Sequence, residues 1–393
     1  MMKGSMRRNL NRATLIVLAV AVCSGALAQE DTQRDVSMLM EGRAAVRRGL
    51  RWLAERQQEN GSWQDQPAIT GLVVTGMVGS GLEEYGPRSE PVTAALDYIR
   101  GFAKPNGGIY DRYYASYSTS ICAMALVEAG LPQDEELLRK AREYLLGAQA
   151  DESEDISADN VQYGGWGYEK HASGEGMHRA DMSNTQFALE AIRALEQVAE
   201  EDRPAVAGTG EGERTRTELC YEKAVQYLER CQNLQQTNDQ SWASNDGGFV
   251  YRPGESKAGE TSEGGLRSYA GMTYAGLKSL IYARLSKDDP RVRAAYDWIR
   301  SNWSVEENAG LGQQGLYYHY VTMARALNAY GAERIVDPDG EAHDWRRELV
   351  GQLLEVQHGD GHWVNDSGRW MERIPELTTA YSVLAIEHAL RGW

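Results

Sequence analysis

The chain is poor in cysteine, with only 4 in 393 residues, and just three of them follow residue 28. Cys220 and Cys231 are eleven positions apart on one expected helix, roughly 16 Å along its axis, so they cannot form a disulfide. Cys122 falls in an apolar run and is expected to be a buried small residue. A chain of this length can bury a large core without covalent cross-links.

Basic charge is also scarce, because 41 Lys and Arg stand against 57 Asp and Glu, for a formal net charge of −16. Nucleic acids and anionic membrane surfaces are recognised by basic patches. The balance therefore argues against nucleic acid as a partner, and it says nothing about the fold.

Long hydrophobic runs are absent after the first 28 residues, where Leu15 to Val22 is short and apolar. A basic start precedes this run, and the small residues Ala26-Leu27-Ala28 follow it. This order is typical of a cleaved signal peptide over residues 1–28. We therefore expect a periplasmic or extracellular protein with no integral membrane segment once the signal is removed; the alternative is an uncleaved anchor.

A repeated unit dominates the rest of the chain. A helix rich in Ala, Leu and Arg leads into a Gly-Gly-aromatic or Gly-x-Trp element, and a helix rich in small residues follows. The glycine elements begin at residues 61, 107, 164, 247, 310 and 361. Six units predict six helical hairpins, that is, an all-α protein.

The two helices of a unit differ in character. The first has apolar residues at helical spacing between charges, which predicts one wet face, whereas the second is nearly uncharged and should be covered on most sides. This favours an (α/α)6 toroid, with inner and outer rings, over an open solenoid, whose repeats keep a nearly fixed period. The expected domains are a flexible segment at 29–42 and a single barrel at 43–393, with long loops at 150–180 and 237–267 and an insertion at 200–218.

The segment from Arg48 to Trp63 resembles the QW repeat of squalene–hopene and oxidosqualene cyclases. Weaker copies are Ala141 to Gln149 with Gly165-Trp166, and Leu353 to Trp363. The resemblance implies the terpene cyclase and prenyltransferase fold. It also implies a structural role for these residues, in which Gln ties the helix end and Trp packs across it.

The family's chemistry lies where inner helices begin. Its cyclases carry Asp-x-Asp-Asp-Thr there, and the matching segment here is Asp181-Met182-Ser183-Asn184-Thr185, with Ser183 in the place of the acid. The related prenyltransferase β subunits bind zinc through Asp, Cys and His. Tyr317-Tyr318-His319-Tyr320 resembles the segment with that His, but no Asp-x-Cys pair accompanies it. We therefore expect no metal and no cofactor.

Candidate site residues follow from this placement. Asp181, His178 and His319 are the candidates for acid–base chemistry, and the candidate ligand-binding residues are Asn184, Tyr117, Trp166, Tyr269, Tyr274 and Tyr318. Aromatic usage supports a polar ligand, because there are 21 Tyr and only 3 Phe, and buried hydroxyls need partners. The alternatives are that Asp181 only caps its helix and that the tyrosines only pack the ring.

The leading hypothesis is an exported toroid that binds a polar or amphiphilic small molecule at the barrel mouth, and whether it also acts on that molecule is left open. The alternatives are a diverged isoprenoid cyclase or isomerase, a non-enzymatic envelope scaffold and a carbohydrate-active toroid, so an isoprenoid and a carbohydrate are both candidate ligands. Asp337-Pro338-Asp339-Gly340 is expected to be a turn, with a loose calcium site as the alternative.

Overall fold

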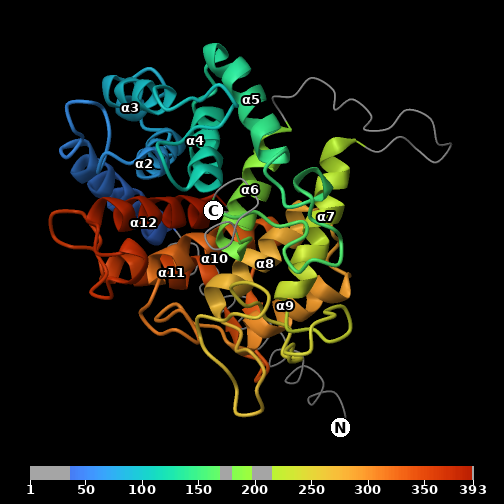
Figure 1. The fold of residues 1–393 in the computed structure, drawn as a ribbon. Helices are drawn as coiled ribbons and strands as arrows, with labels where there is room; N and C mark the ends of the chain where they lie inside the picture. The colour runs from blue at the N-terminus through green and yellow to red at the C-terminus, as the bar shows by residue number, and fades with distance from the viewer. Residues whose placement is uncertain (1–35, 169–178, 197–214, 392–393) are drawn as a thin grey trace, which may run out of the picture.

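The computed structural model describes residues 36–168, 179–196 and 215–391 (Figure 1). The expected signal peptide, His178 and most of the expected insertion lie outside the described residues. Within them no helix combines the length and apolarity needed to cross a bilayer.

The described chain is almost entirely helical, as the repeat predicts. The first helices of the six pairs are residues 36–54, α3 (Glu90–Arg100), α5 (Glu135–Leu146), α7 (Arg216–Cys231), α9 (Pro290–Ser301) and α11 (Trp345–Glu355). The second helices are α2 (Pro67–Gly79), α4 (Ala115–Ala129), α6 (Met182–Leu195), α8 (Ala270–Tyr282), α10 (Leu316–Tyr330) and α12 (Pro375–Leu390). The prediction of an all-α fold is confirmed.

The minor elements are short. They are the antiparallel strands β1 (Ile335–Val336) and β2 (Ala342–His343), and the 3-10 turns η1 (Glu83–Tyr85), η2 (Pro132–Asp134), η3 (Glu152–Glu154) and η4 (Arg369–Met371). The β-hairpin joins α10 to α11 and contains the turn that was expected at Asp337 to Gly340, where Gly340 has φ +88°.

The second helices of the pairs pack against one another in the order α2, α4, α6, α8, α10, α12, and α12 also packs against α2 (Figure 1). Each of these helices is buried on most sides, as in α12, where Leu377 to Ile386 are all buried. The first helices of the pairs each bury one stripe, as in α3, where Val92, Ala95, Leu96 and Ile99 are buried. The sparse-charged helices are therefore the inner layer.

Four glutamines tie the turns between paired helices to the next repeat. The side-chain amide of Gln149 donates to the carbonyl oxygens of Gly164 and Cys220, each at 2.9 Å. Gln57, Gln232 and Gln357 make the same pair of bonds at their own turns. Each Gln thus satisfies one carbonyl in its own turn and one on the next outer helix, or on the first helix in the case of Gln357.

The turn glycine is fixed by the same neighbour. At Gly164 φ is +88°, and a Cβ there would lie 1.8 Å from the carbonyl oxygen of Lys223 on α7. The last repeat makes these contacts with the first helix, because Gln357 donates to Ala45 at 3.0 Å and Gly361 packs on Arg48. The sixth pair is therefore joined to the first.

The first helix begins by residue 36, within the segment 29–42 that was expected to be flexible. The reason is local packing: Met38 is partly buried against the core and lies 3.9 Å from the Cβ position of Gly351 on α11. Cys122, Cys220 and Cys231 are all buried and free, which confirms their expected state.

Candidate functional site

Asp181 stands at the N-terminus of α6 and is 1% exposed. Its carboxylate accepts hydrogen bonds from the backbone N–H of Asn184 at 2.9 Å and from the Asn184 side-chain amide at 2.8 Å. The side chain therefore caps its helix, which satisfies orphan N–H groups there. Of the six inner helices, all within the described residues, α6 is the one whose N-cap side chain accepts such a bond.

The capping hydrogen bonds do not fully offset the effect of burial on the pKa of this carboxyl group. Burial raises the pKa of Asp181 to about 6, against hydrogen bonds from Asn184 and Tyr251 and the charge of Arg252. No ion pair to Asp181 occurs among the described residues. The group is therefore a buried acid whose pKa lies close to neutrality, which is the property required of a general acid or base.

Two loops bring tyrosines onto this acid. The backbone of Asp181 donates to Trp166 at 3.0 Å, and that of Met182 donates to Tyr251 at 2.9 Å, so both loops are bonded to the start of α6. Tyr168, two residues beyond Trp166, is held by a bond from the backbone of Ser116 on α4. Burial and the Asp181 charge raise the pKa values of both Tyr168 and Tyr251. These hydroxyls are therefore neutral donors beside the carboxyl group.

Tyr269 and Tyr318 complete the polar group. Tyr269 is the N-cap residue of α8, and burial followed by the charges of Tyr318 and Asp181 raises its pKa well above the ordinary value. Tyr318 is near Ser183, and its hydroxyl accepts a hydrogen bond from Gln186 at 3.2 Å. Five helix starts and loops thus supply hydroxyl, amide and carboxyl groups to one place.

Two buried acceptors in this group have no partner. The side-chain oxygen of Asn184 and that of Gln186 make no hydrogen bond among the described residues, and both residues are at most 1% exposed. A buried unsatisfied acceptor costs about 1–3 kcal/mol, so such groups in a native protein usually meet a water molecule or a ligand. Their position beside Asp181 favours a hydrogen-bonding ligand there.

Aromatic rings lie directly beneath the polar group. Phe187 makes edge contacts with Tyr117 on α4 and Tyr318 on α10, with ring centroids 5.2 and 6.3 Å apart. Tyr381 on α12 contacts Tyr318 at 6.2 Å, and its hydroxyl lies 3.3 Å from that of Tyr117. Because these rings come from four different inner helices, they form an aromatic plate across the interior.

A buried ion network follows further along the inner helices. Glu190 on α6 accepts from Lys278 on α8 at 2.6 Å and from Arg325 on α10 at 3.1 Å. Lys278 is 1% exposed, and burial lowers its pKa to about 8 despite the adjacent Glu190. The arrangement joins three inner helices electrostatically below the aromatic plate.

The structure separates the sequence-predicted residues into two groups. Asp181, Asn184, Tyr269, Tyr318 and Tyr117 are brought together at the polar group and its aromatic plate, as described above.

His319 lies elsewhere, buried beside Tyr274 with ring centroids 5.4 Å apart. Burial lowers the pKa of His319 to about 3, opposed by the backbone of Ser304. Among the described residues no hydrogen bond, ion pair or ring contact joins His319 or Tyr274 to Asp181. Both ring nitrogens of His319 are buried without a hydrogen-bond partner among these residues, as are the side-chain oxygens of Asn184 and Gln186.

Trp166 and Thr185 belong to the repeat. The Trp166 indole donates to the carbonyl of Leu145 at 2.8 Å, and its backbone donates to the Thr185 hydroxyl at 3.1 Å. Trp63 and Trp363 make equivalent pairs of bonds in their own turns. The match of Thr185 to the cyclase motif therefore reflects a structural position that other repeats share.

Tyr168, Tyr251, Gln186 and Phe187 were not among the nominated residues. Tyr168 and Tyr251 lie in the two long loops expected at 150–180 and 237–267, and nothing in the sequence singled out these two tyrosines. Gln186 and Phe187 are one turn after Ser183 on α6, where helical spacing places them on the same side as Ser183 and Glu190.

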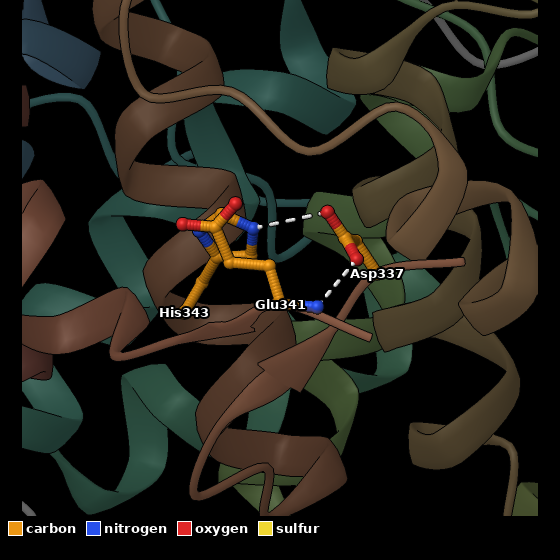
Figure 2. Close-up of side chains that lie close together, drawn as sticks. All are labelled: Asp337, Glu341 and His343. Atoms are coloured by element: carbon orange, nitrogen blue, oxygen red, sulfur yellow. Dashed lines mark hydrogen bonds and ion pairs between the residues drawn. The ribbon is translucent and has the colours of Figure 1, made fainter. Parts of the chain in front are cut away.

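A cluster on the β-hairpin places ligand atoms of Asp337, Glu341 and His343 within 4.8 Å of one another (Figure 2). His343 lies 3.6 Å from Asp337 and 3.2 Å from Glu348, and the backbone N–H of Glu341 donates to Asp337 at 2.8 Å. These contacts link the residues of the hairpin to one another and to the start of α11. Glu341 is exposed, so the cluster does not form a buried metal centre.

The fold is an α-toroid like that of type II terpene cyclases. The structure is similar to the type II terpene cyclase MstE from Scytonema without bound ligand, with 13% identity, 90% of this chain and 99% of that chain covered, and a TM-score of 0.53. A variant of the same enzyme in complex with its substrate, geranylgeranyl dihydroxybenzoate, matches with 14% identity, 91% and 99% coverage, and a TM-score of 0.52.

A family 76 glycoside hydrolase from a bovine Bacteroides thetaiotaomicron strain is also similar, with 11% identity, 88% of this chain and 78% of that chain covered, and a TM-score of 0.55. No family model matches the sequence, and no curated protein matches it. At these identities the likeness concerns the fold, so the chemistry has to be argued from the site.

Proposed function

We propose that this chain is an exported (α/α)6 toroid that binds an amphiphilic small molecule at the N-terminal ends of α6, α8 and α10, and that Asp181 exchanges a proton with it. The ligand's polar group would lie among Asp181, Tyr168 and Tyr251. Its apolar part would lie against the aromatic plate.

One observation carries the proposal: a buried carboxyl group with its pKa raised to about 6 is surrounded by tyrosine hydroxyls from separate segments, and no cation forms an ion pair with it among the described residues. If Asp181 served only to cap its helix, an ionised carboxylate with an ordinary pKa would stabilise the helix N-terminus most. Holding the acid at a raised pKa costs stability, which is typical of functional sites.

The unsatisfied oxygens of Asn184 and Gln186 indicate that the ligand carries hydrogen-bond donors, because each oxygen requires one. A hydroxyl or phenol supplies one and also accepts from the tyrosines. The Scytonema cyclase binds a substrate with a polyprenyl chain and a dihydroxybenzoate group. A molecule of this general kind, with a hydroxyl-bearing head and an apolar tail, fits the two zones of the present site.

A second candidate is an isoprenoid cyclase or isomerase in which Asp181 is the proton donor. It is favoured by the aromatic plate, since the faces of Tyr117, Phe187 and Tyr318 stabilise a developing cation. In such a step Asp181 would add its proton to a carbon–carbon double bond. The resulting cation would be quenched by ring closure with loss of a proton from carbon, so the product would keep the mass of the substrate.

The test measures binding of two probe classes to the purified chain by calorimetry. Geranylgeraniol represents hydroxyl-bearing isoprenoids, and cellobiose and maltose represent carbohydrates. We expect geranylgeraniol to bind. Tyr251→Phe and Asp181→Asn should each lower its affinity about tenfold or more, because each removes one charge-assisted or buried hydrogen bond.

Tyr163→Phe is the matched control, because its hydroxyl donates to Glu152 at 2.7 Å, away from Asp181. Equal affinity in wild type and all three variants would refute the site, and binding of the disaccharides alone would favour a carbohydrate-active toroid. Chromatography and mass analysis of the incubated isoprenoid then separate binding from catalysis. A product of unchanged mass and altered retention, absent with Asp181→Asn, is the outcome expected for a cyclase.

A further inference from the structure

A cavity of about 800 Å³ opens at the other end of the inner helices. It lies between residues 36–54, the C-terminal end of α2 and the C-terminal end of α12, where the first and last pairs meet. The polar group around Asp181 is at the opposite, N-terminal end of its own helix. The cavity is therefore separate from the site of the proposed function.

Arginines line one side of this cavity. Arg43, Arg47 and Arg51 are spaced four residues apart on the first helix, so they share one face of it. Their guanidinium groups make no hydrogen bond or ion pair with any part of the chain that the structure describes. All three arginines are exposed, so water solvates them and they need no partner within the chain. Like charges at this spacing repel each other, and the stripe leaves three guanidinium groups at the cavity rim available to an anion.

The rest of the cavity lining is apolar and includes one buried acid. Met40, Leu82 and Leu390 contribute hydrophobic surface to the cavity. Glu387 on α12 also lines it and is 8% exposed, and neither of its carboxyl oxygens has a hydrogen-bond partner among the described residues. Burial raises the pKa of Glu387 well above the ordinary value, against the charge of Arg391, and so favours its protonated form, which can donate a hydrogen bond to a ligand oxygen.

We propose that this cavity binds a phosphate ester with an alkyl chain, its phosphate on Arg43, Arg47 and Arg51 and its chain against Met40, Leu82 and Leu390. Guanidinium groups match phosphate oxygens in pairs, and three unpaired cations suit a dianion better than a carboxylate. The unpartnered Glu387 supplies a further donor for a phosphate oxygen. The apolar lining distinguishes an ester from free phosphate.

Calorimetry of the full chain with dodecyl phosphate, inorganic phosphate and dodecyl maltoside tests the assignment. We expect dodecyl phosphate to bind at one site, at least about tenfold tighter than inorganic phosphate, because several buried methylenes each add about 0.8 kcal/mol. Arg47→Gln with Arg51→Gln should weaken dodecyl phosphate about tenfold or more, as expected for lost charge-assisted bonds.

Arg88→Gln with Arg293→Gln is the matched control, since both arginines are exposed and lie outside the cavity. It removes the same charge and should change affinity less than about twofold. Met40→Gln should weaken dodecyl phosphate and leave inorganic phosphate unchanged. Equal losses in both double variants, binding of dodecyl maltoside as tight as dodecyl phosphate, or no binding of either phosphate would each overturn the proposal.

Discussion

Asp181→Asn should stabilise the protein, and the gain should depend on pH. The carboxyl group has a folded-state pKa of about 6 against an ordinary value of 3.8. Because an acid with a raised pKa binds its proton more tightly in the folded state, stability is lost as pH rises from the ordinary value through the folded one. The difference corresponds to about 3 kcal/mol for the fully buried group.

Asparagine preserves the shape and most of the capping function. Its side-chain oxygen can accept from the backbone N–H of Asn184, while its amide can donate to the Asn184 oxygen if that side chain turns over. That oxygen is without a partner in the native protein, so turning costs no existing bond on that side. Replacing a charged acceptor by a neutral one loses about 1 kcal/mol, which leaves a net gain of about 1–2 kcal/mol.

Urea denaturation followed by circular dichroism, at about pH 7.5 and about pH 4, measures this gain. We expect Asp181→Asn to raise the free energy of unfolding at the higher pH only. Asp134→Asn is an opposite control, because Asp134 is 2% exposed and accepts two 2.8 Å bonds from Arg100. Asp134→Asn should lower the free energy of unfolding. Destabilisation by Asp181→Asn that is equal at both pH values would refute the argument.

Three further changes test other parts of the structure by the same unfolding measurement. Glu190→Gln should destabilise by about 3–5 kcal/mol, since it leaves Lys278 and Arg325 as buried, uncompensated cations; a loss below about 1 kcal/mol would contradict a buried network. Gln149→Ala should cost about 2 kcal/mol, as two buried carbonyls lose their donor, and a neutral result would contradict its role in the turn. Glu387→Gln should stabilise at neutral pH because the raised pKa of Glu387 penalises its ionised form; the gain should fade toward acid pH, and a pH-independent effect would count against it.

The helices were predictable because their signals are local. Apolar residues at helical spacing, with charged residues between them, indicated the outer helices, and stretches with few charges indicated the inner ones. The turn at Gly164 was also predictable from its glycine, because only glycine fits where a backbone carbonyl lies against the α-carbon.

The candidate site was only partly predictable. Asp181 was found because it precedes an inner helix, but His319 occupies the equivalent region of α10 and points to a different environment beside Tyr274. Sequence position gives the end of a helix and not the direction of a side chain around its axis. Tyr168 and Tyr251 reach Asp181 through loop backbone bonds to α4 and α6, which no periodicity encodes.

The bond from Gln357 to Ala45 has a consequence for how the molecule assembles. In an open array, a terminal repeat can fray while the others persist. Here the turn of the last repeat forms its hydrogen bond with the first helix, so this bond can form only after the first and last repeats have packed together. Gly42 on the first helix packs against Leu390 on α12, so residues 36 and 391, where the described chain starts and stops, belong to helices that meet at this junction. A permuted chain that links these two residues and opens between α5 and α6 should keep the bond from Gln357 to Ala45.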